Sequence, residues 1–408
     1  MNLPVARGRA AHIVLVTAAF VGALFLWILV PLSGPGDDFR LYLLGAAALN
    51  AGENPYDRDR SAEIARTLGF PGVAPIDSGL AADFSAPVFL AAILVPLLPL
   101  GTGVAALVFF VVNLAATTGA TVLGVRLAGG TQRAWKWAAL SVLAWPITLS
   151  LALGQPNGVI ALSLAISAWA AARRPYLAAL LAGAPVGLAA GLKLLPAVLL
   201  LYFLMTGRWA ALGWGVASGL ATVVVSALLF GTTPWLEFVR YTPILGARLG
   251  YAENVSLTGI AIRIQQGPSS LLDDHIARSL TPLTAILLVL GFLLVAVTVW
   301  VAKSLPVAGA YSLTLGATML AAPLVWPHYA TWLLPFVLAQ CALQPAGPSR
   351  WLLIVSTLLI LLPTGPLEIA WPIWLLIRLQ TIGLLCLLPA IALGAHTSTQ
   401  KTPALWPT

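Results

Sequence analysis

The sequence predicts an all-α polytopic membrane protein. Of its 408 residues, 60% are hydrophobic and only 8% are charged, and the mean hydropathy is +0.96. An ordinary soluble domain has about 25% charged residues, so the composition excludes a soluble globular enzyme and a disordered chain. Lipid leaves no partner for open backbone, and the sequence lacks the alternating segments of a membrane barrel, so helices are the expected spanning elements.

The apolar runs, cut at charges and at Gly/Pro clusters, predict about twelve spanning helices, several of them shorter than the roughly 20 residues that a span needs. The first follows Arg7 and Arg9 and shows no clear small-residue cleavage site, so it is expected to remain as a span. The expected helices lie at 12–32, 103–126, 134–151, 157–172, 176–191, 194–206, 210–230, 282–302, 306–323, 329–343, 350–363 and 371–394.

The charges predict the orientation of these helices. With the N-terminus inside, the inside loops are short and contain basic residues but none of the thirteen Asp and Glu residues. The net charge of +8 is therefore read as membrane topology, and no nucleic-acid partner is expected. The inside basic residues are Arg7, Arg9, Arg126, Arg133, Lys136, Arg173, Arg174, Arg208, Lys303, Arg350 and Lys401.

Residues 1–408 are expected to form a single transmembrane domain with two long outer loops, 33–102 and 231–281. Long loops in a compact protein are usually functional. The first loop contains two expected helices, Phe39–Ala51 and Arg58–Leu68, and the spacing of apolar residues in the former predicts an amphipathic helix for the membrane interface. Its apolar face consists of Phe39, Tyr42, Leu43, Ala46 and Leu49. The segment 86–100 carries three prolines and is expected to lie in or dip into the interface.

Asp37 and Asp38 follow the first expected helix at the outer membrane surface. A partly desolvated aspartate is a better proton acceptor near neutral pH, which favours a catalytic base. The structural alternative is a helix N-cap, because Asp38 precedes Phe39 and an expected helix. One aspartate can serve each purpose.

Gln155 and Asn157 lie in the sequence Gly154-Gln155-Pro156-Asn157 at an outer turn, and can either face a cavity or form only a tight turn. Lys193 stands alone in an apolar stretch, where a charge costs several kcal/mol unless it is paired or reaches water. It can extend along the helix to the interface, or bind an anionic group such as a lipid phosphate.

The second loop contains Glu253, Asn254 and Arg263. Arg263 can bind a phosphate through its planar guanidinium, or remain a solvated loop charge. Trp326 and His328 belong to the sequence Trp326-Pro327-His328-Tyr329, in which an imidazole among aromatic rings can contact a phosphate or a sugar, or be a structural histidine.

The topology places all groups with chemical potential on one face of the membrane, which predicts a single outward-facing active site. They are Asp38, Gln155, Lys193, Glu253, Arg263 and His328. The two cysteines and four histidines show no metal-ligand spacing, and nucleotide-binding loops and nucleophile elbows are absent from the sequence. No metal and no cofactor is expected, and the acids of the first outer loop leave a divalent ion open as an alternative.

These motifs resemble glycosyltransferase family 87, formerly a domain of unknown function, within the GT-C superfamily of polyprenol-phosphate-mannose-dependent mannosyltransferases. The resemblance covers most of the chain and depends on the order and spacing of its motifs. One departure is Phe84-Ser85-Ala86-Pro87, where the family often has aromatic-x-Pro-Pro. The other carrying segments are Asp38–Tyr42, Asn50–Asp57, Gly154–Asn157, Gly187–Pro196 and Trp326–Tyr329.

The resemblance implies a GT-C-like helix bundle and an inverting transfer of a hexose, with mannose expected, from a polyprenyl-phosphate sugar to an acceptor hydroxyl. It implies that Asp38, or its neighbour Asp37, is the general base. Lys193, His328 and Arg263 are implied at the donor phosphate, where preorganised charge stabilises the leaving group. The expected substrate-binding residues are Tyr42, Gln155, Asn157, Glu253, Asn254 and Trp326.

The expected partners are the lipid-linked sugar donor, a glycolipid or glycan acceptor, and membrane lipids, at the extracytoplasmic side of a bacterial plasma membrane. Three alternatives remain open: a transporter or flippase for a glycolipid, a GT-C enzyme with another lipid-linked sugar such as arabinofuranose, and an inactive scaffold. A transporter typically uses buried midplane charges and paired repeats. Here the acids gather in one long outer loop and no repeat is visible.

Overall fold

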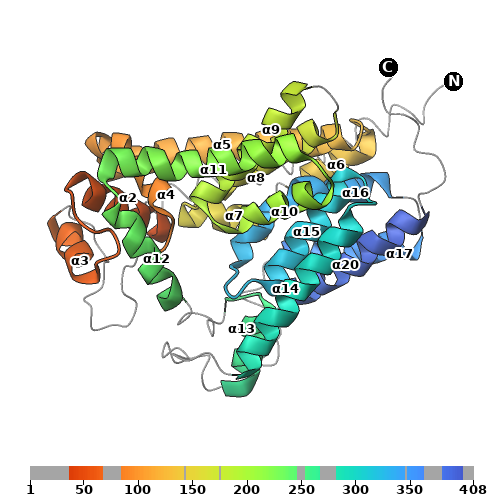
Figure 1. The fold of residues 1–408 in the computed structure, drawn as a ribbon. Coiled ribbons are helices and arrows are strands. Elements are labelled where there is room, and N and C mark those ends of the chain that lie inside the picture. The colour runs from red at the N-terminus through yellow and green to blue at the C-terminus, as the bar shows by residue number, and fades with distance from the viewer. Residues whose placement is uncertain are drawn as a thin grey trace.

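A computed structural model describes residues 36–67, 84–141, 144–173, 176–245, 253–266, 282–344, 347–362 and 379–397. In these ranges the regular structure is entirely helical, as expected. One half of the body contains α5 (Gly101–Leu127), α8 (Asn157–Ala171), α9 (Tyr176–Leu192) and α11 (Trp209–Phe230) (Figure 1). The other half contains α14 (Pro282–Ala302), α15 (Val307–Ala321), α16 (Leu334–Leu343), α17 (Pro348–Leu361) and α20 (Leu379–Thr397).

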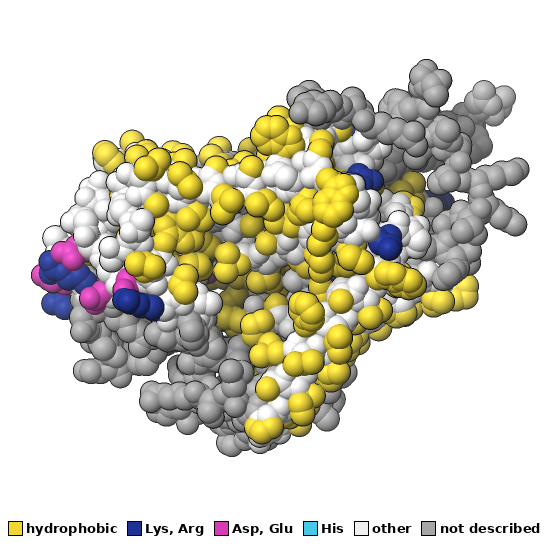
Figure 2. Space-filling view, in the orientation of Figure 1, with side chains coloured by type: hydrophobic (Ala, Val, Ile, Leu, Met, Phe, Trp, Pro, Cys, Tyr) yellow, Lys and Arg dark blue, Asp and Glu magenta, His cyan; other side chains and the backbone are white. Residues whose placement is uncertain are grey.

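Three described helical stretches are long and apolar enough to cross a membrane: Val88–Leu127, Trp209–Phe230 and Ala285–Ala302. A fourth is possible if α6 (Gln132–Ser141) and α7 (Trp145–Leu153), which meet at a 45° bend, form one span. Many of their apolar side chains are exposed, and they cover much of the face shown in Figure 2. This outward apolar surface is what lipid requires, and the chain is a membrane protein.

The expected count of twelve spans is not reached among the described residues, because several apolar segments form helices shorter than a membrane is thick. The helix at 12–32 and the start of 371–394 lie outside the described residues. The segment 194–206 forms η3 (Leu195–Ala197) and α10 (Val198–Met205), and 329–343 forms η6 (Pro327–Trp332) and α16. The other shorter apolar helices are α8, α9, α15, α17 and α20.

The first outer loop forms α2 (Asp37–Asn50), α3 (Arg58–Thr67), α4 (Val88–Leu94) and η2 (Val95–Leu100). The expected apolar face of α2 exists, but it packs inside the protein, mainly against α4 and η2, rather than against a membrane surface. Leu44 and Ala48, which lie outside that face, are also buried. The apolar spacing of α2 therefore reflects burial by neighbouring helices, and its place at the membrane interface stays a prediction.

The segment 86–100 is helical and continues directly into α5. Its first half, α4, buries Val88, Leu90, Ala91 and Leu94 and packs against α2. The prolines at its second half accompany the tighter 3-10 helix η2. The second loop contains α12 (Thr233–Leu245) and α13 (Leu257–Gln266).

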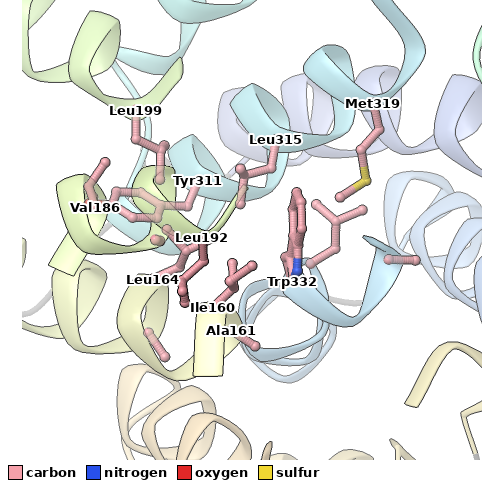
Figure 3. Close-up of a cluster of buried hydrophobic side chains, with 14 of the residues drawn as sticks. Ile160, Ala161, Leu164, Val186, Leu192, Leu199, Tyr311, Leu315, Met319 and Trp332 are labelled. Atoms are coloured by element: carbon pink, nitrogen blue, oxygen red, sulfur yellow. The ribbon is translucent and has the colours of Figure 1, made fainter. Parts of the chain in front are cut away.

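A buried apolar cluster joins the two halves of the body (Figure 3). Ile160 and Leu164 come from α8, Leu192 from the end of α9, Tyr311 from α15 and Trp332 from η6. The close approach of α9 and α11 supports this arrangement, because small residues face each other there and bring the backbones together. The cluster therefore fixes the ends of α9 and η6, where two of the candidate site residues are found.

Candidate active site

Asp38 lies in the first turn of α2 and is partly buried. The ring of Phe39 packs against Phe109 of α5, with 4.8 Å between the ring centroids, and this contact anchors the start of the helix. Gly36 is the N-cap residue, and no side chain caps this end. The N-cap alternative for Asp38 is therefore wrong, and its carboxylate accepts a hydrogen bond from the Gln155 side chain instead. The side chain of Asp37 lies outside the described residues.

Gln155 is brought to Asp38 by the turn between α7 and α8. Gly154 ends α7 in the left-handed conformation with φ 69°, and a Cβ at this position would lie 2.5 Å from Cβ of Phe39. Only glycine combines this φ with so close an approach at low cost. The Gln155 amide then contacts three side chains: Nε2 donates to Oδ2 of Asp38, and Oε1 accepts from the Tyr42 hydroxyl at 2.8 Å and from Nζ of Lys193 at 2.5 Å.

Lys193 follows the last residue of α9 and is 8% exposed. Its ammonium group points inward to Gln155 and lies 4.2 Å from the centroid of the Tyr329 ring. The alternative in which Lys193 extends to the outer interface is therefore not observed. A cation over an aromatic face is attracted by the ring, so amide, ring and the nearby Asp38 carboxylate offset part of the cost of burying this charge. Burial nevertheless lowers the pKa of the Lys193 ammonium to about 7.

Aromatic residues of η6 form one wall of the site. Tyr329 stacks on Trp332 with 4.5 Å between centroids, and His328 lies between Trp326 and Tyr329, at 6.4 Å and 5.1 Å. His328 is buried, and Nε2 has no hydrogen-bond partner among the described residues. This nitrogen is therefore a polar group that a bound ligand could satisfy.

The Asn157 side chain supports η6, which forms this aromatic wall, rather than facing a ligand. Its Oδ1 accepts from Nε1 of Trp332 at 3.0 Å, and its Nδ2 donates to the carbonyl of His328 at 3.3 Å. Because Asn157 is completely buried, it serves the geometry of η6. The expected substrate contact becomes a positioning contact.

Asn254 and Arg263 support the chain segment that leads into η6. The buried Asn254 side chain accepts from the backbone N–H of Ser256 and of Val325, and donates to the carbonyl of Pro323 at 2.8 Å. Arg263 is also buried, and Nη1 donates to the Asn254 carbonyl at 2.9 Å. Both residues thus stabilise the chain that leads into Trp326 and His328. Glu253 is exposed.

The structure brings together Asp38, Tyr42, Gln155 and Lys193, with His328 and Trp326 beside them. Tyr329 and Trp332 had no role predicted from the sequence. The only sequence signal for Tyr329 was its place in the motif that contains His328, together with an isolated lysine elsewhere in the chain that an aromatic ring could accompany. Burial raises the pKa of the Tyr42 hydroxyl well above its ordinary value, followed by the charge of Asp38, so Tyr42 is a neutral hydrogen-bond donor.

The described residues contain no group of three or more His, Cys, Asp or Glu side chains that could hold a metal ion. Residues 68–83, part of the acid-rich first loop, lie outside the described residues. The chemical groups that the site does offer are a carboxylate, an ammonium, an imidazole and several aromatic faces. This combination suits proton removal from a hydroxyl and the binding of an anion.

Comparison with known proteins identifies the relatives of this chain. The model of glycosyltransferase family 87 matches residues 84–327, which include Gln155, Lys193 and Trp326. Asp38 precedes that region, and His328 follows it directly. No solved structure matches the chain significantly.

The relatives are named mannosyltransferases. The polyprenol-phosphate-mannose-dependent alpha-(1-2)-phosphatidylinositol pentamannoside mannosyltransferase of Mycolicibacterium smegmatis is 31% identical over 323 residues, 76% of this chain and 70% of the relative. The enzyme of the same name from Mycobacterium tuberculosis is 30% identical over 350 residues, 82% and 73% of the two chains. A phosphatidylinositol mannoside mannosyltransferase of Mycolicibacterium smegmatis is 29% identical over 54% of this chain. The chain therefore belongs to glycosyltransferase family 87 and is a glycosyltransferase.

Proposed function

We propose that this enzyme transfers a hexose, with mannose as the first candidate, from a polyprenyl-phosphate sugar to a hydroxyl of a glycolipid or glycan acceptor. The observation that carries the proposal is the meeting of Asp38 and Lys193 on one amide, that of Gln155. A proton acceptor and a cation lie at opposite ends of this group, as a transfer between a hydroxyl and a phosphate-linked sugar requires. The mannose donor is supported by the names of the relatives.

In the proposed reaction, Asp38 removes the proton of the acceptor hydroxyl while its oxygen attacks the anomeric carbon. The bond from this carbon to the phosphate oxygen breaks, and the lipid phosphate leaves as an anion, so it needs no general acid. Attack opposite the leaving group inverts the anomeric configuration. Asp37 is retained as the neighbouring candidate for the base.

The departing phosphate gains negative charge, and Lys193 is a cation that shares the Gln155 amide with the base. Its ammonium has three N–H bonds, of which Gln155 accepts one, so donors remain for phosphate oxygens. His328 adds a ring nitrogen without a partner among the described residues. Such fixed charges and donors stabilise a developing anion without reorganisation. Arg263 was also expected at the phosphate, but its contact with the Asn254 carbonyl favours a supporting role.

The acceptor is proposed to enter beside Asp38 and Trp326. Trp326 is partly exposed and stacks parallel to His328, and an aromatic face of this kind suits a sugar ring. Glu253 is exposed at the same segment as Asn254 and can contact sugar hydroxyls. The active site is proposed to face the extracytoplasmic side of a plasma membrane. We propose no metal and no separate cofactor.

The test is sugar transfer by purified protein in liposomes, with radiolabelled polyprenyl-phosphate mannose as donor and a phosphatidylinositol mannoside as acceptor. Asp38→Asn should lower the rate by about 10²–10⁴-fold, the usual contribution of a general base. Asp57→Asn makes the same chemical change at an exposed residue and should retain activity. Full activity of Asp38→Asn would refute the base assignment.

The products separate the alternatives. Inversion predicts a product linkage of the opposite anomeric configuration to the donor, which NMR of the isolated product determines. A transporter or flippase would move the labelled lipid across the liposome membrane without forming a new glycosidic bond. Transfer from a pentose-linked donor, but not from the mannose donor, would support the arabinofuranose alternative.

A further inference from the structure

The Gln155 side chain forms hydrogen bonds with both the proposed base and the proposed phosphate-binding cation. It is 5% exposed, and its three partners come from α2 and from the break after α9. The substrate contact that was expected of Gln155 does not account for this geometry, because protein groups already occupy both ends of its amide.

The chemistry of the partners fixes the orientation of the amide. The Lys193 ammonium can only donate, so the group that faces it must be the carbonyl oxygen. An ionised carboxylate can only accept, so the group that faces Asp38 must be the amide N–H. A glutamate at this position would satisfy Lys193 and repel Asp38, and an apolar residue would satisfy neither. Gln155 therefore matches two chemically opposite partners.

We propose that Gln155 is a positioning residue that couples binding of the donor phosphate at Lys193 to the basicity of Asp38. The inference rests on the proposed function. In the free enzyme the Lys193 charge polarises the Gln155 carbonyl, which strengthens the N–H donated to Asp38, because hydrogen bonds in a chain reinforce one another. This holds the carboxylate in place and keeps it a weak base.

When the donor phosphate binds Lys193, its negative charge offsets the ammonium charge. The polarisation of Gln155 then falls, and the hydrogen bond to Asp38 weakens. Asp38 becomes a stronger proton acceptor only when the sugar to be attacked is present. The acceptor hydroxyl is therefore activated after donor binding, which limits unproductive proton removal in the empty site.

Several charged or titratable groups act on this chain. Asp38 interacts electrostatically with Tyr42 of α2, with Lys193 after α9 and with Tyr329 of η6. His328 interacts electrostatically with Lys193. The tyrosines are neutral near pH 7. Burial lowers the pKa of the Lys193 ammonium to about 7 and lowers that of His328 below its ordinary value, so both titrations must be separated from that of Asp38. His328→Gln removes the second of them.

The test compares the pH dependence of kcat/KM for the donor, which reports the free enzyme, with that of kcat, which reports the donor-bound enzyme. The base must be unprotonated, so a stronger base loses activity at higher pH. The coupling predicts that the acid limb of kcat lies at higher pH than that of kcat/KM. The probe is polyprenyl-phosphate mannose at a saturating acceptor concentration, and His328→Gln should retain the separation.

Gln155→Met keeps the length of the side chain but removes all three hydrogen bonds of the amide, including those to Asp38 and Lys193. It should narrow the separation between the two acid limbs and lower kcat by about tenfold to a hundredfold, no more than the lower end of the ~10²–10⁴-fold that a general base contributes. Tyr42→Phe is the matched control, since it removes the third contact of Gln155 and leaves the Asp38–Gln155–Lys193 chain intact. It should keep the separation whatever its effect on the rate.

Gln155→Glu provides a second variant if the methionine variant does not fold, with thermal unfolding as the folding control. Its carboxylate next to Asp38 should move the acid limb of kcat/KM to higher pH. An unchanged separation in Gln155→Met, or an unmoved limb in Gln155→Glu, would overturn the coupling. Absence of transfer by the unaltered enzyme would instead reject the proposed function, so the two failures are distinguishable.

Discussion

At the scale of single residues, the site keeps one ammonium group, that of Lys193, buried inside a largely apolar body. Lys193 is buried beside Leu192 and an apolar 3-10 helix, where an unpaired charge would cost several kcal/mol. The Gln155 oxygen, the Tyr329 ring and the nearby Asp38 charge share the compensation. A cation maintained at such cost favours a role in binding an anion.

Lys193→Ala is expected to weaken donor binding more than it slows the bound complex. A hydrogen bond to a charged group contributes about 1.5–3 kcal/mol, which corresponds to an increase of about tenfold to a hundredfold in the KM of the donor. Donor titrations of the transfer rate measure this change. Lys303→Ala, which removes an exposed lysine between α14 and α15, is the control. An unchanged donor KM in Lys193→Ala would exclude Lys193 from the phosphate site.

At the scale of elements, the site is assembled by interruptions of helices rather than by helices themselves. Asp38 begins α2, Gln155 lies in the turn before α8, Lys193 follows α9, and His328 is in the short helix η6. Each interruption has a local cause, such as Gly154 with its positive φ or the prolines in η3 and η6. Helix ends therefore place polar groups where continuous apolar helices could not.

The segment before η6 depends on Asn254, which is bonded to the backbone of residues 323 and 325. Asn254→Ala would remove the acceptor of the buried N–H groups of Ser256 and Val325, at about 1–3 kcal/mol each. The Pro323 carbonyl would keep its hydrogen bond from the Ser256 hydroxyl. We expect a lower midpoint of thermal unfolding and a higher donor KM, because His328 loses its support. Asn54→Ala, which removes a local turn contact in the first loop, is the matched control. Unchanged stability and unchanged donor KM would show that Asn254 does not position η6.

These elements show which parts of the structure the sequence could predict. Apolar runs correctly located α5, α8, α11 and α14, because apolarity determines where a chain can be helical in or near lipid. The same signal did not predict that other helices bury the apolar face of α2, because a helix buried by protein and one lying on lipid share the same spacing of apolar residues. The meeting of Gln155 with both Asp38 and Lys193 was beyond prediction, since it depends on the angles of three breaks.

At the scale of the whole molecule, the charges have a pronounced asymmetry. In Figure 2 the visible acidic side chains gather at the end that carries α3. There Arg60 forms ion pairs with Glu53 and Glu63. At the opposite end, the charged side chains that are visible among the described residues are all basic. The Arg60 contact lowers the pKa of Glu53, so this carboxylate remains charged below the ordinary range. Acid-free basic loops are typical of the inner side of a membrane, which supports an active site opening toward the outside.

Cysteine accessibility in intact cells tests this orientation. Glu53→Cys lies in the expected outer loop, and Lys303→Cys lies in the expected inner turn after α14. Both are made in a background that lacks Cys341 and Cys386, of which Cys341 is fully buried. A membrane-impermeant maleimide should label Glu53→Cys in intact cells and Lys303→Cys only after permeabilisation. The reverse pattern would turn the molecule over, and Asp38, at the start of α2 while Glu53 follows the end of α2, would then face a cytoplasmic donor.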